Sequence, residues 1–251
     1  MKNLKGVIAA AMMLGSSSAM AALDLSLLGG ASEFEALTKD LGAATSYKGV
    51  IPAEPLGLII GIDVGLEASY TEFATPAWAQ AIYGTNKAGF LLPRLHLHKG
   101  LPFNLDLGYV YIPEIKALNV SYQGGEVRWS PLDGGMVMPA MSVRLAYTQM
   151  NLNDQLFIKN SSVEVLASKG FLMFTPFAGA GLVQSNTDLQ IPLTAFGVPD
   201  PTDTSITGNA KVMQTKLFAG MNVNLLALNF AAEWDMIGKT QSYSFKVGIR
   251  W

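Results

Sequence analysis

The chain ends with Ser242-Tyr-Ser-Phe-Lys-Val-Gly-Ile-Arg-Trp251, in which apolar residues alternate with polar or small ones. Successive side chains of a β-strand point to opposite faces of the sheet, so this stretch has one apolar and one polar face. It therefore predicts an amphipathic strand that ends on an aromatic residue. One face would carry Tyr243, Phe245, Val247, Ile249 and Trp251, and the other Ser242, Ser244, Lys246, Gly248 and Arg250.

The stretch Gly57–Thr71 alternates in the same way and is long for a soluble sheet, where strands of about 5–6 residues are usual. The same pattern, less regular in places, predicts eight strands between these two. They are Phe90–Lys99, Asn104–Ile112, Leu118–Trp129, Pro139–Met150, Gln155–Ser168, Thr175–Thr187, Ala210–Asn224 and Leu228–Ile237. The total is even, as it is in bacterial single-chain transmembrane barrels.

The composition is unusual for a soluble domain. Hydrophobic residues make up 50% of the chain and charged residues 14%, whereas about 25% charged residues is typical of soluble domains. After the first residues, no stretch is long and apolar enough for a membrane helix, so the apolar residues are spread over alternate strand positions. The chain has no cysteine, which excludes disulfides and thiolate metal sites. Its net charge of −2, without clustered Lys and Arg, argues against nucleic-acid binding.

The N-terminus has the pattern of a secretory signal peptide. Lys2 and Lys5 precede the apolar run Gly6–Leu14, and Ala19-Met-Ala21 fits the small-x-small cleavage rule. We expect a signal peptide over residues 1–21, an N-terminal segment over residues 22–55 and an antiparallel transmembrane β-barrel over residues 56–251.

The N-terminal segment contains a predicted short helix, Ser32–Leu41, with Ser32 as N-cap and Gly42 as its end. Two placements remain open for it: a plug inside the barrel lumen, or a periplasmic helix that covers the barrel base. Strands at Leu23–Leu28 and Thr45–Val50 would instead give a twelve-stranded barrel. The candidate plug residues, which share one helix face, are Phe34, Leu37 and Leu41.

Short and long connections alternate along the predicted barrel. The longer ones, Glu72–Gly89 and Asp188–Asn209, are expected to face outside, and the short turns and both chain ends the periplasm. We expect exposed aromatic residues to form girdles at the two membrane–water interfaces. Candidates are Tyr47, Tyr70, Trp78, Tyr83, Tyr109, Tyr111, Trp129, Trp234 and Tyr243.

If the apolar strand face contacts lipid, the other face lines the lumen. Its acids and bases are nearly equal in number, which favours pairing across a filled interior, although a polar path for a solute is the alternative. His96 and His98 share this face, but a metal or catalytic role would need partners that the neighbouring sequence does not supply. The candidate lumen residues are Asp63, Glu67, Arg94, His96, His98, Asp106, Glu126, Arg128, Arg144, Glu164, Lys216, Glu233, Asp235, Lys246 and Arg250.

The final strand with its terminal Trp251 resembles the C-terminal signature of bacterial outer-membrane barrels, which the barrel assembly machinery reads. The stretches Pro52–Gly57, Lys99–Pro102, Ser168–Phe171 and Thr175–Gly179 resemble an uncharacterised family of proteobacterial outer-membrane proteins. The resemblance implies a barrel in the Gram-negative outer membrane, with membrane lipid and the assembly machinery as partners, and it supplies no catalytic residue, cofactor or ligand.

These observations predict a narrow or plugged channel or transporter for a small or amphipathic solute. A closed structural or interaction barrel is the alternative. A hydrolase that uses His96 or His98 is disfavoured, because no Gly-x-Ser-x-Gly, His-Glu-x-x-His or phosphate-loop motif is present. We expect no catalytic, metal or cofactor-binding residues.

Overall fold

The computed structural model describes residues 31–57, 61–75, 89–115, 120–135, 137–152, 154–192 and 205–251. The predicted signal peptide, the stretch Leu23–Leu28 and the girdle candidates Trp78 and Tyr83 lie outside these ranges. Within the ranges, no helix has the length and apolar character needed to cross a membrane.

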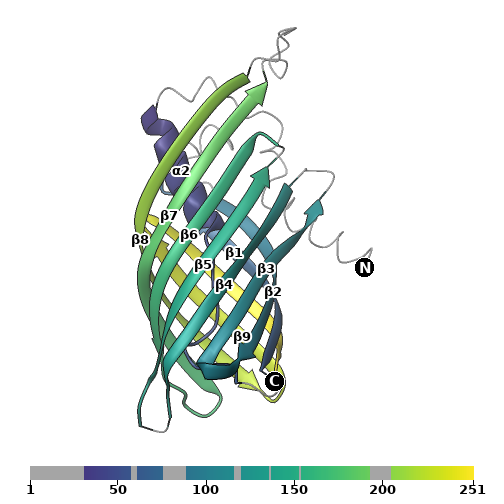
Figure 1. Cartoon of the computed structure of the whole chain (residues 1–251), viewed down its shortest axis with the longest axis vertical. Helices are drawn as coiled ribbons and strands as arrows, with labels where there is room; N and C mark the ends of the chain where they lie inside the picture. The colour runs from purple at the N-terminus through teal and green to yellow at the C-terminus, as the bar shows by residue number, and fades with distance from the viewer. Residues whose placement is uncertain are drawn as a thin grey trace.

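Ten strands in the described ranges form one closed barrel, in which each strand pairs antiparallel with its sequence neighbour and β1 pairs with β10 (Figure 1). This confirms the predicted ten-strand barrel. The strands are β1 (Ile62–Glu72), β2 (Gly89–Leu101), β3 (Leu105–Ile115), β4 (Val120–Asp133), β5 (Ala140–Leu152), β6 (Leu156–Ser168), β7 (Phe174–Pro192), β8 (Ser205–Leu225), β9 (Leu228–Ile237) and β10 (Thr240–Arg250).

The two ends of the barrel differ. The basal end carries the short 3-10 helix η2 (Pro102–Asn104) and Trp251, whose backbone bonds with Ile62 where β1 begins. The distal end carries the β9–β10 turn and the tips of β7 and β8, which extend farther than the other strands (Figure 1). Parts of the predicted loop Asp188–Asn209 are therefore strand, which is a correction to the sequence reading.

Several strands reverse their polarity between the two ends, and β4 is an example. In the basal part of β4, Arg128 faces inward and Trp129 outward, whereas in the distal part Tyr122 faces inward and Gln123 outward. The distal interior is thus an apolar core of the kind found in soluble barrels, and the basal interior is charged. The buried distal cluster contains Phe34, Leu37, Tyr47, Leu92, Val110, Ile112, Val120, Tyr122, Ala146, Met150, Leu156, Ile158 and Leu189.

Residues 31–57, here called the lumen segment, occupy the inside of the barrel. Helix α2 (Ala31–Thr45) fills the distal half (Figure 1), where Asp40 accepts bonds from the backbone N–H of Ala74 and Thr75 and from the Thr240 hydroxyl. The rest continues without strand structure to the base, where the Leu56 N–H bonds to Asp106.

Three expectations about this segment were wrong. Helix α2 continues past Gly42 to Thr45, and the glycine allows close packing, since a Cβ there would lie 2.2 Å from the Ser185 Oγ. Residues Thr45–Val50 form no strand, so the twelve-strand alternative is wrong. Helix α2 begins at the distal end, so the lumen segment enters the barrel opposite Trp251 rather than from the same end.

Candidate functional site in the barrel lumen

The structure places the predicted lumen residues together inside the barrel. Fourteen of the fifteen are buried, and the Arg250 side chain is 16% exposed at the base. Of the plug candidates, Phe34 and Leu37 are buried and Leu41 packs beside the same apolar cluster. The lumen is therefore occupied by side chains of the strands and by the lumen segment.

The base of the lumen is held by two carboxylates with arginine partners. Asp63 contacts Lys246 at 2.9 Å and Arg250 at 2.8 Å. Asp106 pairs with Arg128 at 2.6 Å, and Arg128 also donates to the carbonyl oxygens of Pro52 and Glu54 in the lumen segment. Arg128 thus joins the barrel wall to the backbone of the lumen segment.

The middle of the lumen holds a chain of alternating charges. Glu126 contacts Arg144 at 2.7 Å, Arg144 contacts Glu164 at 2.9 Å, and Glu164 contacts Lys216 at 3.0 Å. Lys216 then donates to the Tyr47 carbonyl oxygen at 2.8 Å. Because buried charges are costly unless paired and hydrogen-bonded, each link depends on the next.

Both histidines face carboxylates that are distant in sequence. His96 bonds to Glu67, which also lies 3.5 Å from Arg94. His98 lies 3.2 Å from the Tyr47 hydroxyl and 3.5 Å from Glu126. Within the described ranges no group of His, Asp and Glu has the geometry to hold a metal ion.

The lumen segment contributes a base that sequence reasoning missed. Lys48 is buried and lies 2.5 Å from Asp235, and it also donates to Ser242 and to the Ala43 carbonyl oxygen. It adds a seventh base to the six predicted ones, and the lumen segment also adds a buried acid, Asp40, to the seven predicted ones. Residues 46–57 show no clear helix or strand periodicity, so the sequence did not predict that Lys48 faces the lumen.

Tyr47 was predicted as a girdle residue, and this was wrong. It is buried, lies against the His96 ring and has the Arg144 guanidinium 6.0 Å from its ring centre. It follows helix α2 inside the barrel, where an aromatic ring fills the space between the apolar distal core and the charged basal lumen.

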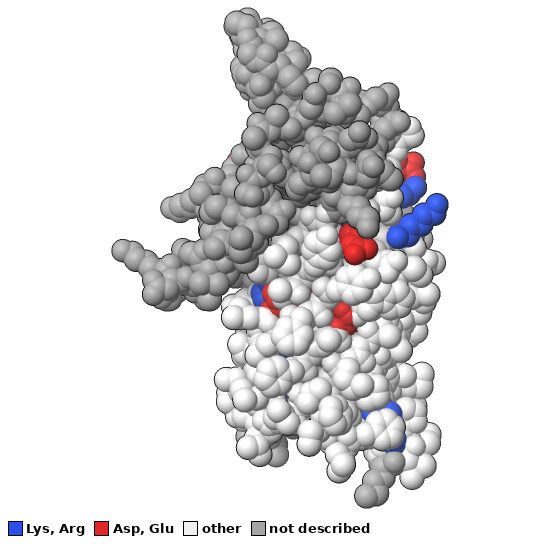
Figure 2. Space-filling view, turned by 180° about the vertical axis from the view of Figure 1, so that it is seen from behind, with Lys and Arg blue, Asp and Glu red and all other residues white. Residues whose placement is uncertain are grey.

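An apolar belt surrounds the basal and middle parts of the barrel. Its exposed side chains include Leu66, Leu97, Leu107, Val127, Leu145, Val163, Leu182, Leu217 and Val247. Tyr70, Tyr243 and Trp234 are exposed and lie in one register row across β1, β10 and β9. Figure 2 shows that the lower part of the visible face carries few charged atoms. Exposed aromatic residues beside an apolar belt are typical of the membrane–water interface.

A closed antiparallel barrel with an apolar belt outside and paired charges inside defines a transmembrane β-barrel, here with a filled lumen. The chain belongs to the family of unknown function DUF6588, whose family model matches residues 59–251. A comparison with curated proteins found no match.

Solved structures with some similarity include the N-terminal β-barrel domain of Pseudomonas aeruginosa OprF, at 13% identity and a TM-score of 0.36, covering 75% of this chain and 97% of that one. The KdgM porin in complex with disordered oligogalacturonate has 6% identity and a TM-score of 0.35, covering 75% and 99%. Neisserial surface protein A has 7% identity and a TM-score of 0.31, covering 76% and 97%.

Proposed function

We propose that the protein is an outer-membrane channel that its own lumen segment closes, and that it passes a small or amphipathic solute when this segment shifts. The signal-like N-terminus, the terminal Trp251 and the apolar belt support the location. In this placement the basal end faces the periplasm and the distal end the outside.

The observation that carries the proposal is the way in which the lumen is filled. A barrel of about eight strands is narrow enough for its own side chains to fill, and the present barrel has ten. The additional space is taken by the lumen segment, which is bound inside the barrel through hydrogen bonds and ion pairs such as Lys48–Asp235. A separate segment held only by non-covalent contacts is an occupant that can move without unfolding the strands.

A closed structural barrel is the second candidate, and the balanced charges of the lumen favour it. Paired buried charges make a stable filling, and nothing in the pairing requires the segment to leave. A closed barrel would act through the residues at its two ends. Its conductance would stay at zero in every state of the lumen segment.

The test fixes the lumen segment to the wall with a disulfide. The chain has no native cysteine, and a Cβ at Gly42 would lie 2.6 Å from the Ser185 Cβ. A disulfide needs about 3.8 Å between these atoms, so a helix shift of about 1 Å allows the bond in the variant Gly42→Cys/Ser185→Cys. Each single-cysteine variant serves as a control for the substitutions themselves.

Single-channel recording in planar bilayers gives the readout. We expect openings from the reduced double variant and both single variants, and none from the oxidised double variant. Equal conductance before and after oxidation would show that the solute path avoids the lumen segment. The closed barrel would be favoured if no form conducts, including a variant in which Lys48→Met weakens the polar contacts of the lumen segment.

A further inference from the structure

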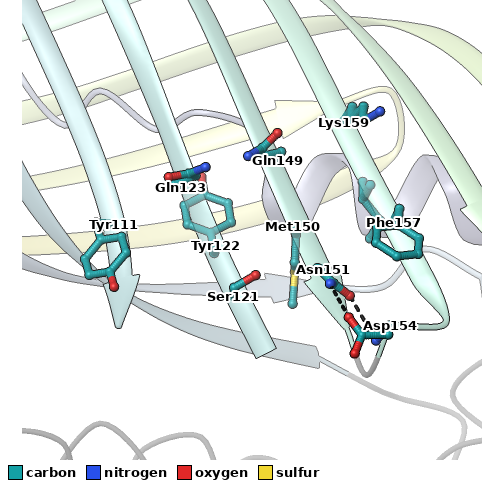
Figure 3. Close-up of a pocket in the computed structure, with 11 residues that line it drawn as sticks. Tyr111, Ser121, Tyr122, Gln123, Gln149, Met150, Asn151, Asp154, Phe157 and Lys159 are labelled. Carbon is teal, nitrogen blue, oxygen red and sulfur yellow. Dashed lines mark hydrogen bonds between the residues drawn. The ribbon is translucent and has the colours of Figure 1, made fainter. Parts of the chain in front are cut away.

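The outer face of the barrel has a hollow of about 590 Å³ on β3–β6 near the distal end. Figure 3 shows its lining, with Asn151 and Asp154 joined by hydrogen bonds at the β5–β6 turn. Most lining residues lie on the outward parity of their strands. They include Tyr111, Gln123, Gln149, Asn151, Phe157 and Lys159.

A row of polar side chains crosses this hollow and continues beyond it. Strand register places Gln123 beside Gln149, Gln149 beside Lys159, Lys159 beside Asn186, and Asn186 beside Lys211. Neighbouring strands lie about 4.8 Å apart, so the two lysines are about 10 Å apart across one intervening strand. The row thus combines two cations with three amides on one outward face.

The positive charge of this row is available to a ligand. In the described ranges, no ion pair joins Lys159 or Lys211 to a carboxylate, and both lysines are exposed. Two acids lie nearby and keep their charge: Asp154, which lines the hollow, is bonded to Asn151, and Asp188 accepts from Asn209. An anion would therefore meet two cations that form no ion pair with a carboxylate in the described ranges, with amide groups between them.

The next outward row toward the base is mixed, with Tyr147, Ser161, Gln184 and Met213, and the row after it is mostly apolar. Leu145, Val163 and Leu182 are exposed there and begin the apolar belt. A ligand that spans this boundary needs an anionic, hydrogen-bonding head and an apolar tail, and the hollow has room for the head.

We propose that the row from Gln123 to Lys211, with the hollow beside it, binds the phosphorylated sugar headgroup of an outer-leaflet glycolipid. The lysines bind its phosphates, the amides bind its sugar hydroxyls, and the acyl chains lie on the apolar belt below. The site rests on the proposed outer-membrane location and does not depend on gating by the lumen segment.

Binding of diphosphorylated lipid A to the detergent-solubilised mature protein tests the site. The variant Lys159→Gln/Lys211→Gln is compared with Lys239→Gln, which removes an exposed lysine in the distal β9–β10 turn. Near a charged membrane surface each lysine is worth about fivefold in affinity, so the double variant should bind about 25-fold more weakly and Lys239→Gln normally. Dephosphorylated lipid A should bind wild type and double variant alike, and inorganic phosphate should not displace the lipid.

Equal affinity of wild type and double variant for the phosphorylated lipid would overturn the proposal. Displacement of the lipid by millimolar phosphate would also overturn it, because the row would then be a site for a free anion. A shift in gel mobility between unheated and boiled samples checks that each variant is folded. The assay is carried out without a potential or a channel readout, so a failure of the gating proposal leaves its result intact.

Discussion

The two halves of the lumen segment are held in the barrel by different physical means. Helix α2 inserts Phe34 and Leu37 into the apolar distal core, as a helix packs in a soluble protein. Residues 46–57 instead contact buried charges, with Lys48 on Asp235 and the Val50 N–H on Glu233. The distal contact is non-directional and tolerates small shifts, whereas the basal contact depends on the pairing of individual atoms.

This difference follows the polarity reversal of the strands. Where the exterior faces lipid, polar groups can only be turned inward, so the interior must be a network of paired charges. Where the strands extend beyond the apolar belt, water can solvate the exterior, and the interior can be apolar. The lumen segment matches both environments along its length, helical and apolar in one and extended and polar in the other.

The largest expected effect is an all-or-none contrast between the two ends of the barrel. Ser32 at the start of helix α2 and Leu226 in the basal β8–β9 turn are both exposed. A membrane-impermeant maleimide added to intact cells should label Ser32→Cys and leave Leu226→Cys unlabelled. Both should react after the cells are broken, which is the control for reactivity. Labelling of Leu226→Cys alone in intact cells would reverse the proposed orientation.

The next largest effect is expected from breaking the polar contacts of residues 46–57 with the barrel wall. Lys48→Met leaves the buried Asp235 carboxylate without its cation, and removal of one partner of a buried ion pair costs about 3–5 kcal/mol. The measurement is the free energy of unfolding in urea, followed by tryptophan fluorescence. Adding Asp235→Leu should restore much of the loss, because an apolar pair replaces the ionic one. No loss in Lys48→Met would mean that the pair contributes nothing to the hold.

The sequence predicted the barrel well because its signal is local. Alternation reports which side of a strand faces lipid, and that parity alone assigned Asp63, Arg144 and Lys246 to the inner face, where the structure places them. The ends of β7 and β8 were missed because the same parity carries the opposite polarity there: Leu189 lies inside and Asp188 outside. A pattern rule that expects apolar residues outside treats such a stretch as loop.

The partners inside the lumen could not be predicted, since they depend on barrel closure and on the path of the lumen segment. Glu67 meets His96 only because β1 and β2 pair in one particular register. Lys48 meets Asp235 only because the chain passes through the barrel before β1 begins. Neither contact can be predicted from the spacing of these residues along the chain.

A smaller effect is expected from weakening the distal hold. Leu37→Ala removes a buried side chain from the apolar core and should cost about 2–3 kcal/mol, since such truncations usually cost 2–5 kcal/mol. The core can close partly around the helix, so the loss should lie below that of Lys48→Met. The same urea titration measures it, with Leu217→Ala on the outer face as a control for lost apolar surface. A larger loss at Leu37 than at Lys48 would place the main hold in the distal half.

The smallest effect is expected at an ion pair that resembles Lys48–Asp235 in chemistry but differs in surroundings. Lys39 and Glu35 are 2.7 Å apart on helix α2, with side chains 45% and 52% exposed. Because water and salt screen such a pair, Lys39→Met should change the unfolding free energy by less than about 0.5 kcal/mol, and less still in 0.5 M salt. The distances in the two pairs are nearly equal, so the contrast with Lys48→Met isolates burial as the cause. Similar losses at both lysines would show that burial does not set the contribution of these ion pairs.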